Sequence, residues 1–110
     1  MKWYKDLYLG ELVTSDAKNV IRKIKHNKFV PGVYVIAYRL DSLNLLDIIP
    51  AWELIQVSYP KDTIRVIGLA FGKTEALDLV REIVDETYQV TGSVDVKQYL
   101  KGKWRDEQWK

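Results

Sequence analysis

Gly68–Thr74 is the segment of this sequence whose residue types come closest to a chemical site. Gly68 and Gly72 flank three residues, and Lys73 and Thr74 follow directly. A strand that ends at glycine and turns into a helix can point backbone amides at a phosphate, which a lysine helps to neutralise. The phosphate-binding loop, however, has four residues between its first glycine and Gly-Lys-Thr/Ser. The shorter spacing favours a structural turn, in which Gly72 permits the bend and Thr74 caps the helix.

A small-anion or nucleotide site at residues 68–74 stays open as an alternative, because an exposed helix N-terminus attracts anions. Glu75 stands in the first turn of the same predicted helix and would oppose an anion there. The chain also has no later apolar strand that ends in aspartate and could hold the magnesium of a nucleotide.

A basic segment at residues 17–28 is the second candidate. It carries five Lys or Arg residues and no Asp or Glu. Lys18, Arg22 and Lys25 fall on one face of the predicted helix, where they could contact the phosphates of a nucleic acid. Residues 75–86 have the opposite character, with five acids and a single arginine. The basic face therefore has three interpretations: nucleic-acid contact, a solvated surface, or complementarity to the acidic helix within one chain or across a dimer.

Aromatic residues are the third candidate, because the chain has four Trp and seven Tyr. Exposed aromatic side chains can form a partner interface or stack on bases. Trp52 and Tyr34 are expected in the core. The aromatics near the termini are expected to pack against the core or in a dimer, and the candidate interface residues are Trp3, Tyr4, Tyr8 and Trp104.

Composition argues against several function classes. The chain has no Cys and a single His, so thiol catalysis, Cys-based zinc sites and multi-His metal sites are excluded. We assign no catalytic residue, metal or cofactor and expect a protein that is not an enzyme. The net charge of +2 is too small for the whole chain to act as a nucleic-acid-binding surface. No apolar run is long enough to cross a membrane, so we expect a cytoplasmic protein without membrane contact.

Periodicity and turn signals predict the elements that position these residues. Ser15 and Asp16 precede a helix over residues 17–28, and strands follow over residues 33–38 and 45–49 as a hairpin. Helix is an alternative for residues 45–49. A short helix over residues 51–57 begins after Pro50, and a third strand covers residues 63–70. A long helix then runs from Thr74 to Gly92, with an apolar stripe of Ala76, Leu77, Val80, Ile83, Val84, Thr87 and Tyr88.

The predicted fold is a single α+β domain over residues 1–110. A small three-stranded sheet, made of the hairpin and a third strand, is covered by helices in the order α-β-β-α-β-α-α. The last helix covers residues 95–100. Residues 1–14 form an irregular aromatic arm, and residues 103–110 form a polar tail.

Several segments together resemble a set of small uncharacterised proteins common in clostridia and related Firmicutes. The segments are Trp3–Glu11, Gly32–Ile36, Asn44–Ile49 and Val66–Ala70. The resemblance covers nearly the full length and implies a stand-alone cytoplasmic bacterial protein of unknown function. It supplies no activity, cofactor or catalytic residue.

The leading hypothesis is therefore a non-enzymatic protein that acts through protein contacts and self-associates. Nucleic-acid binding by the basic helix over residues 17–28 is one alternative. A small-anion or nucleotide site at residues 68–74 is the other.

Overall fold

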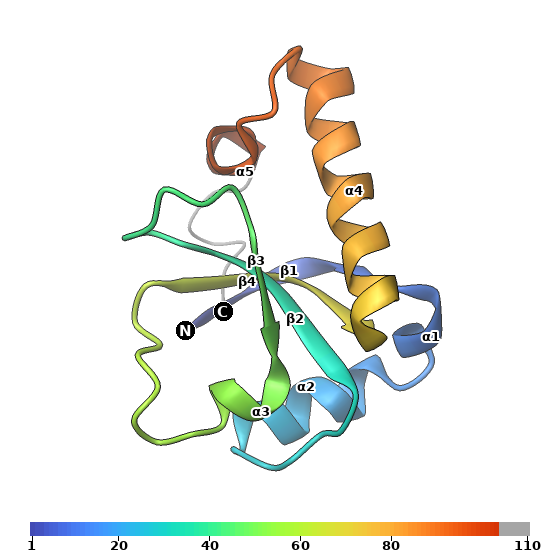
Figure 1. The fold of residues 1–110 in the computed structure, drawn as a ribbon, viewed down its shortest axis with the longest axis vertical. Coiled ribbons are helices and arrows are strands. Elements are labelled where there is room, and N and C mark those ends of the chain that lie inside the picture. The colour runs from blue at the N-terminus through green and yellow to red at the C-terminus, as the bar shows by residue number, and fades with distance from the viewer. Residues whose placement is uncertain (104–110) are drawn as a thin grey trace.

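A four-stranded mixed sheet lies at the centre of the protein in the computed structural model, which describes residues 1–103 (Figure 1). Its strands are β1 (Lys2–Leu9), β2 (Val33–Arg39), β3 (Asp47–Pro50) and β4 (Ile64–Phe71), in the spatial order β1-β4-β2-β3. β1 runs parallel to β4, and the other neighbours are antiparallel. The helices are α1 (Glu11–Thr14), α2 (Ala17–Lys25), α3 (Ala51–Leu54), α4 (Gly72–Thr91) and α5 (Val96–Lys103).

The prediction of a three-stranded sheet is wrong, because the N-terminal segment supplies a fourth strand. Residues 1–14 were expected as an irregular arm, but they form β1 and α1. The element order is therefore β-α-α-β-β-α-β-α-α. Trp3 and Tyr4 point to opposite faces of the sheet, as consecutive residues of a strand do, and both are buried. The α+β class stands, with one more strand than expected.

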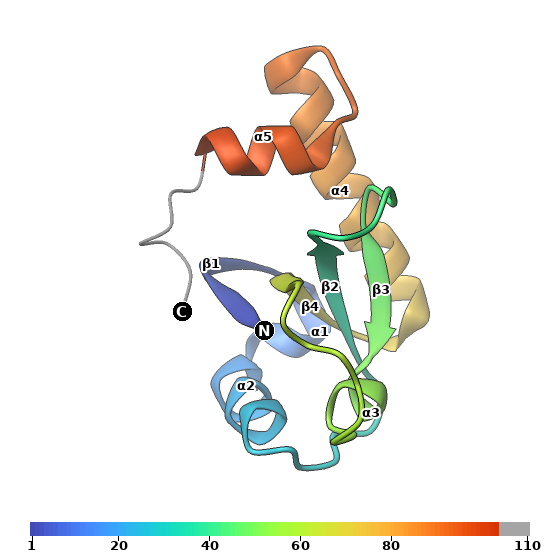
Figure 2. The same cartoon turned by 90° about the vertical axis from the view of Figure 1, so that its left-hand side faces the viewer.

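Helices cover both faces of the sheet and create two apolar cores (Figure 2). The core shared with α1, α2 and α3 contains Trp3, Val13, Val20, Ile24, Val35, Leu54, Val66 and Leu69. The core shared with α4 and α5 contains Tyr4, Ile36, Ile67, Leu79, Ile83, Val96 and Leu100. β2 and β4 are interior strands that contribute to both cores, which explains their nearly continuous apolar sequences.

The predicted β2–β3 hairpin is confirmed, and the helical alternative for residues 45–49 is wrong over Asp47–Ile49, which lie in β3. Two helices are shorter than predicted. α2 ends at Lys25 rather than at residue 28, and α3 ends at Leu54 rather than at residue 57. Gly92 ends α4 with a left-handed φ of 74°, as the sequence predicts for a C-terminal glycine.

Gly68 allows β1 to approach β4 closely. Trp3 pairs with Val66 and Tyr8 with Gly68, so five steps along β1 correspond to two steps along β4. β1 therefore bulges, and its backbone passes over Gly68. A Cβ atom at this glycine would lie 2.8 Å from the carbonyl oxygen of Tyr8. The strand interior therefore requires glycine here.

Candidate functional site

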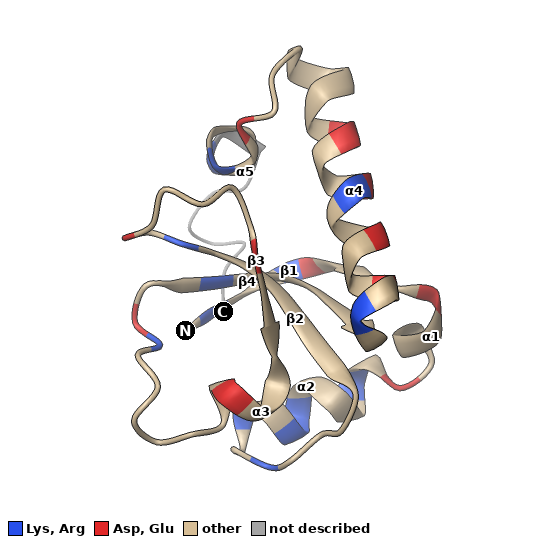
Figure 3. Ribbon diagram, viewed as in Figure 1, with Lys and Arg blue, Asp and Glu red and all other residues tan. Residues whose placement is uncertain are grey.

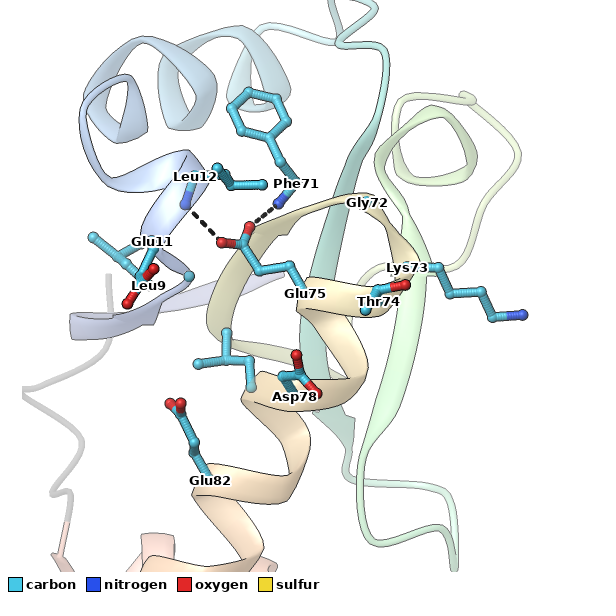
Figure 4. A pocket seen from close by; sticks show the side chains of 12 residues that line it. Leu9, Glu11, Leu12, Phe71, Gly72, Lys73, Thr74, Glu75, Asp78 and Glu82 are labelled. Carbon is cyan, nitrogen blue, oxygen red and sulfur yellow. Dashed lines mark hydrogen bonds between the residues drawn. The ribbon is translucent and has the colours of Figure 1, made fainter.

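The strand–helix turn that resembles a phosphate loop borders an open cleft of about 750 Å³ between α1 and the start of α4 (Figure 4). The carboxylate of Glu75 occupies the amide-rich end of this cleft. Its Oε1 accepts a hydrogen bond of 2.6 Å from the Leu12 amide, and its Oε2 accepts one of 2.5 Å from the Phe71 amide. Two of the amides that line the cleft are thus bound to a carboxylate of the protein itself.

The rest of the cleft is unfavourable for a phosphate. The side chain of Lys73 extends away from the cleft into solvent (Figure 4). The amide of Gly72, whose φ is 76°, donates to the carbonyl oxygen of Gly32 at 2.7 Å. The acids that line the cleft are Glu11, Glu75, Asp78 and Glu82. This geometry supports a structural role for residues 68–74.

The predicted cap of α4 by Thr74 is wrong. Phe71 occupies the N-cap position, and no side chain makes the usual cap bond there. Glu75 takes this role, because it reaches back to the Phe71 amide from one turn inside the helix. It also binds the start of α1, so one carboxylate joins the N-termini of two helices.

The basic residues of α2 share one exposed face, as their spacing predicts. Lys18, Arg22 and Lys25 are exposed, while the opposite face buries apolar side chains in the core. Arg22 Nη2 donates to Asn19 Oδ1 at 2.7 Å. Lys25 Nζ lies 5.5 Å from the ring centroid of Trp3, a cation–π distance that holds this lysine against the protein.

Charge complementarity between α2 and α4 within one chain is not observed. The two helices cover opposite faces of the sheet, so the basic residues of α2 and the acidic residues of α4 lie on different sides of it (Figure 3). The side chains of Arg39 and Asp47 form an ion pair, as do those of Arg81 and Asp78, and neither pair involves α2. Complementarity across a dimer remains a prediction.

Most of the candidate interface aromatics within the described chain pack against the protein itself. Trp3 and Tyr4 are 4% and 8% exposed, so each belongs to one of the two cores. Trp104 lies outside the described residues. The prediction that Trp52 lies in the core is wrong, because its side chain is 50% exposed. Tyr34, also expected in the core, is partly buried.

Tyr8 belongs to a hydrogen-bonded cluster that joins β1, α4 and α5. The hydroxyl groups of Tyr8 and Tyr99 both donate to Glu86 Oε2, at 2.6 and 2.7 Å. Burial raises the pKa of Tyr8 far above its usual range, and the hydrogen bond to Glu86 and its charge raise it further. The phenol stays protonated at neutral pH and serves as a donor that fixes α4 and α5 on the sheet.

The exposed side of α4 carries apolar residues that the sequence interpretation had placed on the core stripe. Leu77 and Tyr88 are 50% and 54% exposed, and Val80 and Val84 between them are partly buried. We call these four residues the α4 stripe. They line an open depression of about 450 Å³ together with Arg81, Asp85 and Val94.

The width of the apolar arc on α4 was the signal that could have revealed this surface. The side chains that α4 buries are Ala76, Leu79, Ile83 and Thr87. At 100° per residue these four positions span about 80° of the helix, and the α4 stripe extends the apolar arc by roughly another 100°. One sheet face covers only the first part of such an arc.

No family model, curated protein or solved structure matches this chain. Its function therefore has to be inferred from its own surfaces. Residues 1–103 bring no three His, Asp or Glu side chains together in a group that could hold a metal ion. In the same part of the chain, no helix combines the length and the apolar character needed to cross a membrane.

Proposed function

We propose that this protein is a non-enzymatic protein that acts by self-association, and that the α4 stripe provides the contact. The observation that supports this is the exposure of Leu77 and Tyr88 on a helix whose other side already covers the sheet. Contiguous exposed apolar side chains of this kind mark interaction surfaces. Their burial against a partner is favourable by about 25 cal/mol per Å² of apolar surface.

The neighbouring strand extends this surface. Leu46 and Ile48, before and within the edge strand β3, are partly buried and pack on the same core as Val80 and Val84. The core beneath the α4 stripe therefore reaches the edge strand of the sheet. An apolar centre beside a strand edge is typical of a protein–protein contact.

Sedimentation equilibrium over a range of concentrations tests this proposal. The double variant Leu77→Gln/Tyr88→Gln removes apolar surface without adding charge, so it should sediment as a monomer where the wild type is dimeric. Phe29→Gln/Val57→Gln is the matched control, because both residues are exposed in loops away from α4. A wild type that stays monomeric at the highest concentration, or equal effects of both double variants, would contradict the proposal.

Nucleic-acid binding by α2 is the second candidate. It is favoured by the exposure of Lys18, Arg22 and Lys25 on one face, with no acidic partner in the described part of the chain. Fluorescence anisotropy with labelled DNA at low salt should detect binding that weakens as salt rises. Replacing these three residues by Gln should reduce affinity and the salt slope, whereas replacing Lys2, Lys73 and Lys101 removes equal charge elsewhere. Absence of binding at low salt would exclude this function.

A cytoplasmic location belongs to the same proposal and rests on the sequence. Fractionation of cells that express the untagged chain would test it, and recovery with the membrane fraction would contradict it.

A further inference from the structure

The two ends of the α4 stripe, Leu77 and Tyr88, exchange places when α4 is reversed about the middle of the stripe. Leu77 and Tyr88 lie eleven residues apart, which is close to three helical turns, so both face the same side of α4. Arg81 lies four residues after Leu77, and Val84 lies four residues before Tyr88. The stripe therefore has a midpoint between residues 82 and 83. Reversing the helix about this midpoint places Leu77 at the level of Tyr88, Val80 at the level of Asp85, and Arg81 at the level of Val84.

We propose that two copies of the chain associate through antiparallel α4 helices related by a two-fold axis at this midpoint. The inference rests on the proposed self-association and specifies its geometry. The axis places Leu77 of each copy opposite Tyr88 of the other. Because the same surface of both copies is used, the assembly closes as a dimer and leaves no free contact for further growth.

Charge complementarity supports this arrangement. Along the helix axis, Arg81 of one copy then lies only one residue, about 1.5 Å, from the level of Asp85 in the other copy. The contact occurs twice by symmetry. In the single chain Arg81 is engaged only weakly, since its Nη1 lies 3.7 Å from Asp78 Oδ1 and both side chains are strongly exposed. Arg81 and Asp85 border the depression formed by the α4 stripe, so both are placed to pair across the dimer.

Three of the other four acids of α4, Glu75, Glu82 and Glu86, do not oppose this pairing, because they lie on the side of the helix that faces β1 and α1. Glu75 is bound by the amides of Leu12 and Phe71, and Glu86 is bound by the hydroxyl of Tyr8. Glu82 lines the cleft beside α1 and not the depression, whereas Asp78 lines the cleft and also lies 3.7 Å from Arg81 at the border of the depression. The surface that meets the second copy is therefore mainly apolar, with Arg81 and Asp85 at its border and Asp78 beside Arg81.

Charge reversal with a mixing step tests the arrangement. Arg81→Asp places two acidic side chains opposite each other at both contacts, and Asp85→Arg places two basic side chains there. Each variant alone should therefore dimerise about tenfold more weakly than the wild type, or worse. An equimolar mixture restores opposite charges at both contacts and should form a one-to-one heterodimer, which native mass spectrometry separates from homodimers by mass. The double variant Arg81→Asp/Asp85→Arg should regain homodimerisation. Circular dichroism of each variant establishes that α4 remains folded.

The outcomes separate this inference from the proposed function. If the charge variants dimerise like the wild type while Leu77→Gln/Tyr88→Gln does not, the antiparallel pairing is wrong and self-association through the α4 stripe stands. Weakened single variants that fail to recover on mixing also overturn the pairing. A monomeric wild type overturns both.

Discussion

Replacing Gly68 by alanine tests the close approach of β1 to β4, the feature of the fold that the sequence interpretation missed. The added Cβ would lie 2.8 Å from the carbonyl oxygen of Tyr8 and 3.2 Å from Leu79 Cδ2. Leu79 can rotate away, but a backbone carbonyl moves only with its strand. Gly68→Ala therefore forces β1 outward, at a cost of about 1–3 kcal/mol typical of an overpacked interior.

This cost is measurable by thermal unfolding. In a domain of this size, 1 kcal/mol corresponds to about 5 °C, so the midpoint should fall by roughly 5–15 °C. Hydrogen exchange of the β1 amides should also accelerate, because the displaced strand opens more easily. Gly72→Ala is the control: it strains a left-handed φ of 76° in open space, so it should lower the midpoint without selectively loosening β1.

A Gly68→Ala variant that unfolds within about 2 °C of the wild type and keeps its β1 protection would refute this reasoning. It would show that the Tyr8 carbonyl lies farther from β4 than the structure places it. Loss of protection in β1 and in distant elements alike would indicate general destabilisation, and it would likewise count against a local contact.

Two further predictions concern Glu75 and the tyrosines. Glu75→Ala should lower the free energy of unfolding by about 2 kcal/mol, because it leaves the Leu12 and Phe71 amides without their charged acceptor. A Cβ at Gly10 would overlap the Glu75 carboxylate, so Gly10→Ala should destabilise the wild type but cost little further stability in the Glu75→Ala background. Urea unfolding of the two single variants and the double variant measures this, and fully additive losses would contradict it. Burial raises the pKa of Tyr8 and of Tyr38, so the folded state holds these protons more tightly than the unfolded chain. The free energy of unfolding should therefore fall as pH rises above about 10, less steeply in Tyr8→Phe, and an unchanged alkaline profile in that variant would refute the assignment.

Local signals predicted the elements whose contacts are also local. The β2–β3 hairpin, the turn at Gly72 and the end of α4 at Gly92 follow from β-branched runs and glycine positions within short windows. β1 could not be predicted in this way. Charged residues and a bulge interrupt its alternation, and its parallel partner β4 lies about sixty residues away in the sequence.

The surface of α4 could be predicted only in part. Helical periodicity correctly marks its apolar residues, but the width and position of the sheet decide which of them are buried. Thr74 is a good cap by residue type, yet Glu75 forms the bond because α1 brings the Leu12 amide to the same place. Such competition depends on tertiary contacts that no local window contains.

Sedimentation equilibrium of the wild-type protein tests self-association most directly. One chain has a mass of 12.9 kDa. We expect the weight-average mass to rise with concentration toward twice this value and to level off there, because a two-fold contact closes. A mass that stays at 12.9 kDa throughout would contradict self-association. A mass that keeps rising beyond the dimer would contradict the two-fold contact of α4.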